Sequence, residues 1–198
     1  MWVELPENDP SGEGYRKATI TGIVAPNISV KFQDGKENQV KAALIYGVND
    51  YRHLPDGYND MVEMDNLSEA ELLYNLKERY QKEKIFTYVG PTLIVLNPYM
   101  FIPELFKSEL LASFQKAVRE LAFEHKKFPP HVWAIGAATM ANLIKDQRNQ
   151  AIVISGESGA GKTENTKFAM KFLTSMNDSG GQKDPNEVSI EDKVSAFL

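Results

Sequence analysis

The chain contains no cysteine. Disulfide frameworks, thiolate zinc sites and cysteine nucleophiles are therefore excluded. No apolar run approaches the ~18 uninterrupted residues that a membrane-spanning helix needs, so we expect no membrane span. The first residues, Met1-Trp2-Val3-Glu4-Leu5-Pro6, also lack the basic and apolar regions of a secretory signal peptide. These absences favour a cytoplasmic protein.

Basic residues are in short supply as well. The sequence has 22 Lys and Arg against 27 Asp and Glu, which gives a formal net charge of −5. Nucleic-acid binding depends on a clustered basic face, so we expect no nucleic-acid partner. The 198 residues, 42% of them hydrophobic, are enough to bury a core in one large domain, or in one medium domain with a small satellite.

The first quarter of the chain predicts a small all-β module. Residues 1–14 are rich in turn-forming residues, and we expect a flexible N-terminal arm there. Residues 18–24 and 28–32 are candidate strands, and Asp34-Gly35 lies in a hairpin turn that leads to a third strand over 38–44. The module is therefore predicted to cover residues 15–52.

Residues 53–198 predict an α/β domain. Ser68 and Glu71 form a capping box that starts a helix over 69–82. Nearly continuous apolar strands, typical of a sheet covered on both faces, are expected within 85–96 and at 151–155. Further helices are predicted over 104–126, 132–148 and 162–176, followed by a polar loop over 177–187 and a final helix from Ser189.

One motif carries chemistry: Gly156-Glu157-Ser158-Gly159-Ala160-Gly161-Lys162-Thr163 matches the phosphate-binding pattern G-x-x-x-x-G-K-[ST]. Glycines let backbone N–H groups approach phosphate oxygens, and the start of the following helix adds unpaired donors and the positive end of its dipole. Lys162 is placed to reach the β- and γ-phosphates, and the Thr163 hydroxyl to coordinate Mg²⁺. A chance glycine-rich turn is the less favoured interpretation. The motif stands between a predicted strand and a predicted helix, which phosphate binding requires and a chance turn does not.

The residues for hydrolysis are not evident. Phosphate-loop enzymes also use an acidic strand end for Mg²⁺ and a residue that orients the attacking water. The apolar strand that ends near residue 96 is followed by Asn97 rather than Asp. The sequence thus predicts nucleotide binding, with no complete set of catalytic residues.

The motif also carries a family resemblance. Residues 156–164, GESGAGKTE, resemble the phosphate loop of myosin motor heads more closely than a generic one. Residues 67–99 are similar to the helix, strand and adenine-side loop near the start of that motor domain, and residues 131–143 to the helix before its phosphate-loop strand. Residues 15–50 resemble the Src-homology-3-like (SH3-like) barrel in front of many such heads. The resemblance implies an incomplete phosphate-loop NTPase core of the α/β class preceded by this barrel.

The resemblance also implies the site residues. Asn97, Pro98 and Tyr99 would border the adenine, and Thr163 would bind Mg²⁺. The phosphates would be surrounded by Gly156, Glu157, Ser158, Gly159, Ala160, Gly161, Lys162, Thr163 and Glu164. Two positions depart from the family pattern: Met100 replaces a usual basic residue, and Leu105 a usual aromatic one, with Phe106 directly after it.

The function implied by the resemblance is that of an actin-based motor ATPase, with ATP, Mg²⁺ and the actin filament as its ligands, associated with the cytoskeleton. We expect the chain to be an N-terminal piece of such a motor that stops before the switch segments. Two alternatives from other classes remain open. One is a compact phosphate-loop kinase, which would need an acceptor site, and the other is a non-catalytic binding module indifferent to Mg·ATP.

Overall fold

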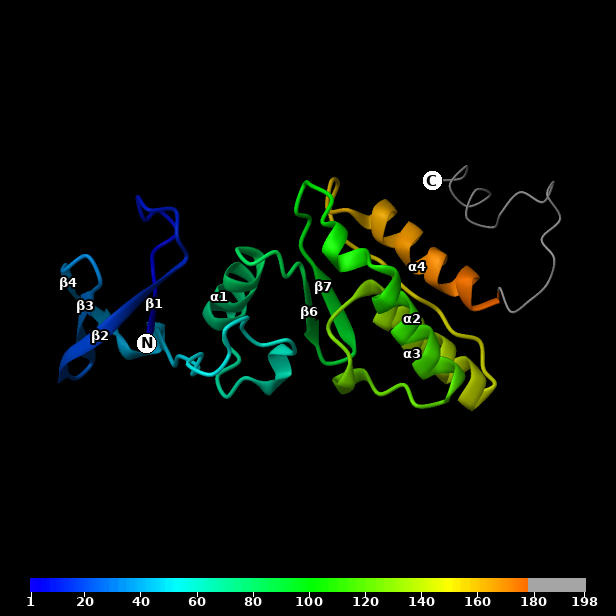
Figure 1. Cartoon of the computed structure of the whole chain (residues 1–198). Helices are drawn as coiled ribbons and strands as arrows, with labels where there is room; N and C mark the ends of the chain where they lie inside the picture. Colours follow the sequence, from blue (N-terminus) through cyan, green and yellow to red (C-terminus); the bar gives the residue numbers. More distant parts are fainter. Residues whose placement is uncertain (178–198) are drawn as a thin grey trace. The chain divides into compact units, whose positions relative to one another are not determined.

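The structure is a computed structural model and describes residues 1–177 (Figure 1). The chain divides into two compact units, Met1–Lys82 and Glu83–Leu198, and each is described by itself. The polar loop predicted over 177–187, apart from its first residue, and the helix predicted from Ser189 fall on residues 178–198, outside the described part. None of the helices within residues 1–177 is long and apolar enough to cross a membrane.

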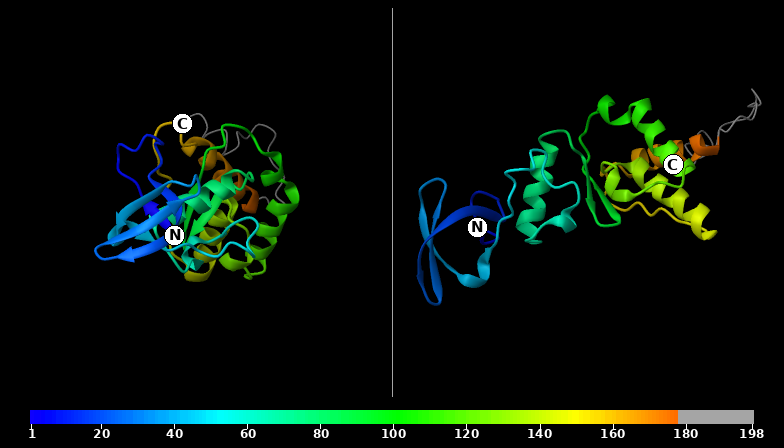
Figure 2. Two further views of the ribbon diagram at one scale, coloured as in Figure 1. Left: turned by 90° about the vertical axis from the view of Figure 1, so that its left-hand side faces the viewer. Right: turned by 60° about the horizontal axis from the view of Figure 1, so that its bottom comes forward.

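The first unit contains a five-stranded antiparallel sheet, and four of its strands lie within the residues predicted to form a small β module. Its spatial order is β4-β3-β2-β1-β5, and Figure 2 shows the ribbon of β2, β3 and β4 as a twisted hairpin set. The strands are β1 (Trp2–Glu4), β2 (Tyr15–Val24), β3 (Asn27–Phe32), β4 (Glu37–Lys41) and β5 (Ile45–Tyr46). Val3, Ala18, Val30 and Phe32 form its buried core.

The first residues of this unit differ from the predicted flexible arm. Trp2–Glu4 form β1, which pairs with both β2 and β5 and therefore lies inside the sheet. Val3 is completely buried. Burial of this side chain and of Trp2 overcomes the turn-forming character of residues 6–14, which form the loop between β1 and β2.

The predicted first helix is α1 (Glu69–Tyr80), and Ser68 caps it by accepting a hydrogen bond from the Glu71 N–H. The second half of the expected capping box is replaced by a longer-range network. The fully buried Glu71 carboxylate accepts hydrogen bonds from Trp2 Nε1, from Asn49 Nδ2 at 2.8 Å and from the Tyr51 hydroxyl at 2.9 Å. These bonds join α1 to β1 and to the connector after β5.

The second unit is built from a hairpin and three helices. The hairpin strands β6 (Phe86–Val89) and β7 (Thr92–Val95) are antiparallel, and the helices are α2 (Ser108–Arg119), α3 (Val132–Asp146) and α4 (Lys162–Asn177). Figures 1 and 2 show the helices together on one side of the hairpin. Short 3-10 turns occupy Ala42–Leu44, Met61–Glu63, Pro103–Phe106 and His125–Lys127, so the helix predicted over 104–126 is shorter than expected.

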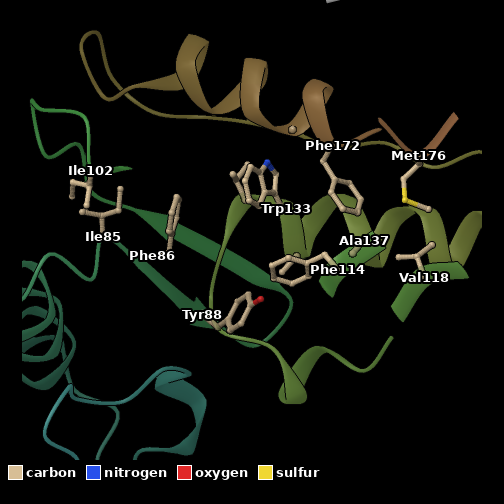
Figure 3. Close-up of a cluster of buried hydrophobic side chains, with 13 residues drawn as sticks. Ile85, Phe86, Tyr88, Ile102, Phe114, Val118, Trp133, Ala137, Phe172 and Met176 are labelled. Atoms are coloured by element: carbon tan, nitrogen blue, oxygen red, sulfur yellow. The ribbon is translucent and has the colours of Figure 1, made fainter. Parts of the chain in front are cut away.

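Aromatic side chains fill the core of this unit. Phe114 of α2, Trp133 of α3 and Phe172 of α4 point into the space between the helices (Figure 3) and are buried. A Cβ added at Gly136 would lie 2.6 Å from the Phe172 ring, so α3 and α4 approach closely only because position 136 has no side chain. This packing fixes the start of α4, and with it the phosphate-loop motif.

The predicted strand over 151–155 does not form among the described residues. The segment is irregular, it pairs with no strand of residues 1–177, and Val153 is 87% exposed. Paired strands lie about 4.8 Å apart and leave no groove between them. Here Ile152 and Ile154 face Leu93 and Val95 of β7 across a groove of ≈ 430 Å³, so the segment does not pair with β7. The described fold thus has helices and a small antiparallel sheet, in line with the α/β class, without the strand that we expected at 151–155.

Candidate functional site

The phosphate-loop motif occupies the turn that leads into α4, as predicted. Gly159 has a φ of +78° and Gly161 a φ of +92°, both in the left-handed region that glycine adopts without strain. Helix α4 begins at Lys162. The first N–H groups of a helix have no partner within the helix and carry the positive end of its dipole. The turn therefore presents donors and partial positive charge at one end of α4.

The charged group of this turn is held by the loop itself. Lys162 Nζ donates to the Gly156 carbonyl at 2.9 Å and to the Glu157 carbonyl at 2.8 Å. An ammonium group has three donors, so these two bonds do not use its full capacity. The cation is therefore fixed over the loop in a position from which it can meet an anion.

Asn97 joins the end of β7 to this loop. Its Nδ2 donates to the Gly159 carbonyl at 2.7 Å, and its Oδ1 accepts from the Tyr99 N–H at 2.8 Å. The second bond closes a tight turn in which Tyr99 has a φ of +54°. The structure thus brings Asn97 and the motif together, although 62 positions separate Asn97 from Gly159.

A groove of ≈ 280 Å³ extends from the loop, and we call it the aromatic groove. Its lining includes Asn97, Pro98, Tyr99, Met100, Phe101, Phe106, Ala160, Gly161, Glu164, Asn165 and Phe168. The ring of Phe106 stacks on that of Phe168 at 3.9 Å between centroids, and Phe101 stacks on Phe106 at 5.7 Å. Phe101 is 64% exposed, which leaves part of its ring open to another group.

The remaining predicted residues lie around the start of α4. Thr163 and Glu164 are exposed in its first turn, and Glu164 forms an ion pair with Lys167 at 2.9 Å. Glu157 and Ser158 are exposed on the loop, and Ala160 lines the groove. Tyr99 is 84% exposed at the groove's edge. Within residues 1–177, no three His, Asp or Glu side chains are grouped so that they could hold a metal ion.

A buried histidine lies in the core behind the groove. His131 caps α3, since its Nδ1 accepts from the Trp133 N–H at 3.0 Å, and its ring packs against Phe86 and Phe106. Burial among these rings lowers the pKa of His131 to about 4. The imidazole is therefore neutral at pH 7 and acts as a structural cap.

Sequence reasoning missed two parts of the site. Asn165 lines the groove, and its Nδ2 donates to the Gly161 carbonyl at 3.0 Å. Its position four residues after Gly161 was the available signal, since such residues lie on one helix face. Phe168 lies within the helix predicted over 162–176, but its stacking with Phe106 depends on contacts that sequence spacing does not show.

Comparison with known proteins places these residues within one family. Residues 58–196 match the family described as myosin head (motor domain). Unconventional myosin-VI of Bos taurus is 42% identical over 201 residues, which cover 100% of this chain and 14% of that protein. Myosin-H heavy chain of Dictyostelium discoideum is 35% identical over 200 residues, covering 98% and 10%. Myosin-13 of Arabidopsis thaliana is 33% identical over 195 residues, covering 98% and 12%. The chain spans 10–14% of the length of these relatives.

Proposed function

Because the chain belongs to the myosin head (motor domain) family, we propose that the second unit binds Mg·ATP, with its phosphates at residues 156–164 and its purine in the aromatic groove. One observation carries this proposal. Lys162 Nζ is held over a glycine-rich turn at the start of α4, and the groove opens from the same turn.

The phosphates fit the turn by charge and by geometry. Unpaired N–H groups and the helix dipole favour an anion at the start of α4. Lys162 contributes a full positive charge, and phosphate oxygens compete well for an ammonium group because hydrogen bonds between charged partners are strong. The Thr163 hydroxyl in the first helical turn would bind Mg²⁺ alongside phosphate oxygens.

The purine fits the groove by stacking. A planar base placed against the exposed part of Phe101 would continue the series of rings formed with Phe106 and Phe168. Pro98 and Met100 supply apolar contacts along the same wall. Phe106 thus supplies the aromatic surface in the groove that Leu105 cannot.

Motor activity is a further part of the proposal. The relatives are myosins, and we propose that ATP hydrolysis coupled to movement on actin filaments, in association with the cytoskeleton, is the activity to which this nucleotide site contributes. Water activation is assigned to none of residues 1–177. We propose that these residues supply nucleotide binding.

Calorimetric titration of the chain with Mg·ATP tests the proposal. We expect Lys162→Ala to lower the affinity by about a hundredfold, because it removes a charge-assisted contact to the phosphates. Lys171→Ala is the matched control, since Lys171 is an exposed lysine on the same helix. Unchanged affinity in Lys162→Ala, or no binding and no thermal stabilisation by Mg·ATP in the natural chain, would refute the site and favour a non-catalytic module.

A further inference from the structure

Asn97 makes contacts that its predicted place beside the adenine does not explain. Its side-chain amide is held from one side, because Oδ1 accepts from the Tyr99 N–H at 2.8 Å. That bond orients Nδ2 toward the loop, where it donates to the Gly159 carbonyl at 2.7 Å. Asn97 Cγ also lies 3.9 Å from the position that a Cβ of Gly161 would occupy. The side chain therefore bonds to one glycine of the phosphate loop and occupies the space beside a second.

The Gly159 carbonyl belongs to a peptide group whose orientation needs such a restraint. Gly159 has a φ of +78° and no side chain, so the residue itself restricts the orientation of the following peptide very little. Because the peptide is planar and trans, its carbonyl and its N–H point in opposite directions. A bond that fixes the Gly159 oxygen consequently fixes the direction of the Ala160 N–H.

The other side of this peptide connects to the lysine. The Ala160 N–H donates to the Glu157 carbonyl at 3.2 Å, and the same carbonyl accepts from Lys162 Nζ at 2.8 Å. Asn97, the 159–160 peptide, Glu157 and Lys162 thus form one continuous hydrogen-bond chain. Hydrogen bonds in such chains reinforce one another. Release at the Asn97 end would allow the Gly159 oxygen to turn toward the phosphates and repel them.

We propose that Asn97 is a positioning residue of the phosphate loop, holding the 159–160 peptide so that its oxygen faces away from the bound phosphates. The proposal rests on the phosphate site proposed above. It differs from an adenine-contacting role in one measurable respect. A residue that shapes the loop affects any ligand with a pyrophosphate group, whereas one that contacts the base affects only nucleotides.

Asn97→Asp and the neutral Asn97→Ser together separate the two roles, because a carboxylate beside the loop also repels phosphates by its charge whereas a hydroxyl does not. Asn97→Asp is isosteric and retains the acceptor for the Tyr99 N–H, but it replaces the donor with a carboxylate oxygen that faces the Gly159 carbonyl. We expect it to lower the affinities for Mg·ATP and for magnesium pyrophosphate by the same factor, about tenfold. Gln115→Glu is the matched control, because Gln115 Nε2 donates to Ser175 Oγ within the same unit, away from the loop. We expect it to leave both affinities unchanged.

The outcomes are distinct. Loss of ATP affinity with unchanged pyrophosphate affinity overturns the proposal, and so does no loss for either ligand. A natural chain that binds neither ligand refutes the proposed function itself. Asn97→Ser must show the same equal loss for both ligands, because its neutral hydroxyl can still accept from the Tyr99 N–H but is too short to reach Gly159. An equal loss in Asn97→Asp alone reports charge repulsion and overturns the inference.

Hydrogen exchange of the Ala160 amide, measured by NMR without ligand, gives a second test. Asn97→Asp should accelerate this exchange, while the exchange rates of the α3 amides stay unchanged. Ala160 exchange that stays at the natural rate in a folded variant contradicts the inference.

Discussion

Replacing Glu71 by Gln should destabilise the first unit far more than its conservative chemistry suggests. The Glu71 carboxylate is fully buried and accepts hydrogen bonds from Trp2, Asn49 and Tyr51. Asn49 cannot reverse its amide, because its Oδ1 accepts from the Asn66 N–H and its Nδ2 donates to the Asn66 carbonyl, both at 2.8 Å. The indole of Trp2 is a donor only.

The magnitude follows from these fixed donors. Glutamine offers one acceptor oxygen and one NH₂ group. In one orientation the NH₂ faces the Trp2 indole, and in the other it faces the Asn49 amide. Either orientation leaves a buried donor unpaired, which costs about 1–3 kcal/mol, and it also replaces charge-assisted bonds with neutral ones. Removing a buried charge offsets part of this loss, so we expect a decrease of about 3 kcal/mol in the free energy of unfolding.

Urea unfolding measures this change, and hydrogen exchange of α1 followed by mass spectrometry assigns the transition to the first unit. Glu69→Gln is the matched control. Glu69 lies in the same helical turn and accepts from the Tyr15 hydroxyl at 3.0 Å, but at an exposed position. We expect its cost to stay below about 1 kcal/mol. Equal effects of the two substitutions would show that the buried network does not determine the stability of this unit.

Two further predictions concern the second unit. In the folded chain the pKa of His131 is about 4, below its ordinary 6.5. Between these pH values the unfolded chain binds a proton that the folded chain does not. The free energy of unfolding therefore falls by up to about 3 kcal/mol as the pH drops from 7 to 4. Urea unfolding at a series of pH values should give a flatter pH dependence for His131→Asn, which keeps a capping acceptor; equal slopes would contradict the assignment. Phe101→Ala should weaken Mg·ATP binding about fivefold through lost stacking, with pyrophosphate affinity unchanged in the same titration. Equal loss for both ligands would place the base elsewhere.

The sequence predicted those parts of the fold that depend on interactions between residues close together in the chain. The alternation over residues 28–32 and the Asp34-Gly35 turn specify a hairpin that needs no distant partner. Ser68 likewise identifies the start of α1 through a bond three residues away. The segment 151–155 shows the opposite case: its apolar residues favour a strand, but a strand exists only beside another strand, and the segment pairs with none of residues 1–177.

The candidate site divides in the same way. The motif itself places Lys162 at the start of α4, and the resemblance places Asn97 close to it. The contact between Asn97 and Gly159 was beyond prediction from spacing, because it depends on how the β6–β7 hairpin packs against α4. The same limitation applies to Glu71, whose hydrogen-bond partners come from β1 and from the connector after β5.

The hydrogen bonds between Lys162 and its own loop would compete with any anion that binds there. The ammonium group already has two carbonyl acceptors, from Gly156 and Glu157, so an anion that takes more than the one remaining N–H gains only the difference between its own attraction and that of the displaced carbonyl. A singly charged anion that approaches from solvent gains little by displacing a carbonyl. A polyphosphate, with several charged oxygens on one chain, gains much more. Under the proposed function, this arrangement would discriminate among anions by charge density, before any contact with the base is made.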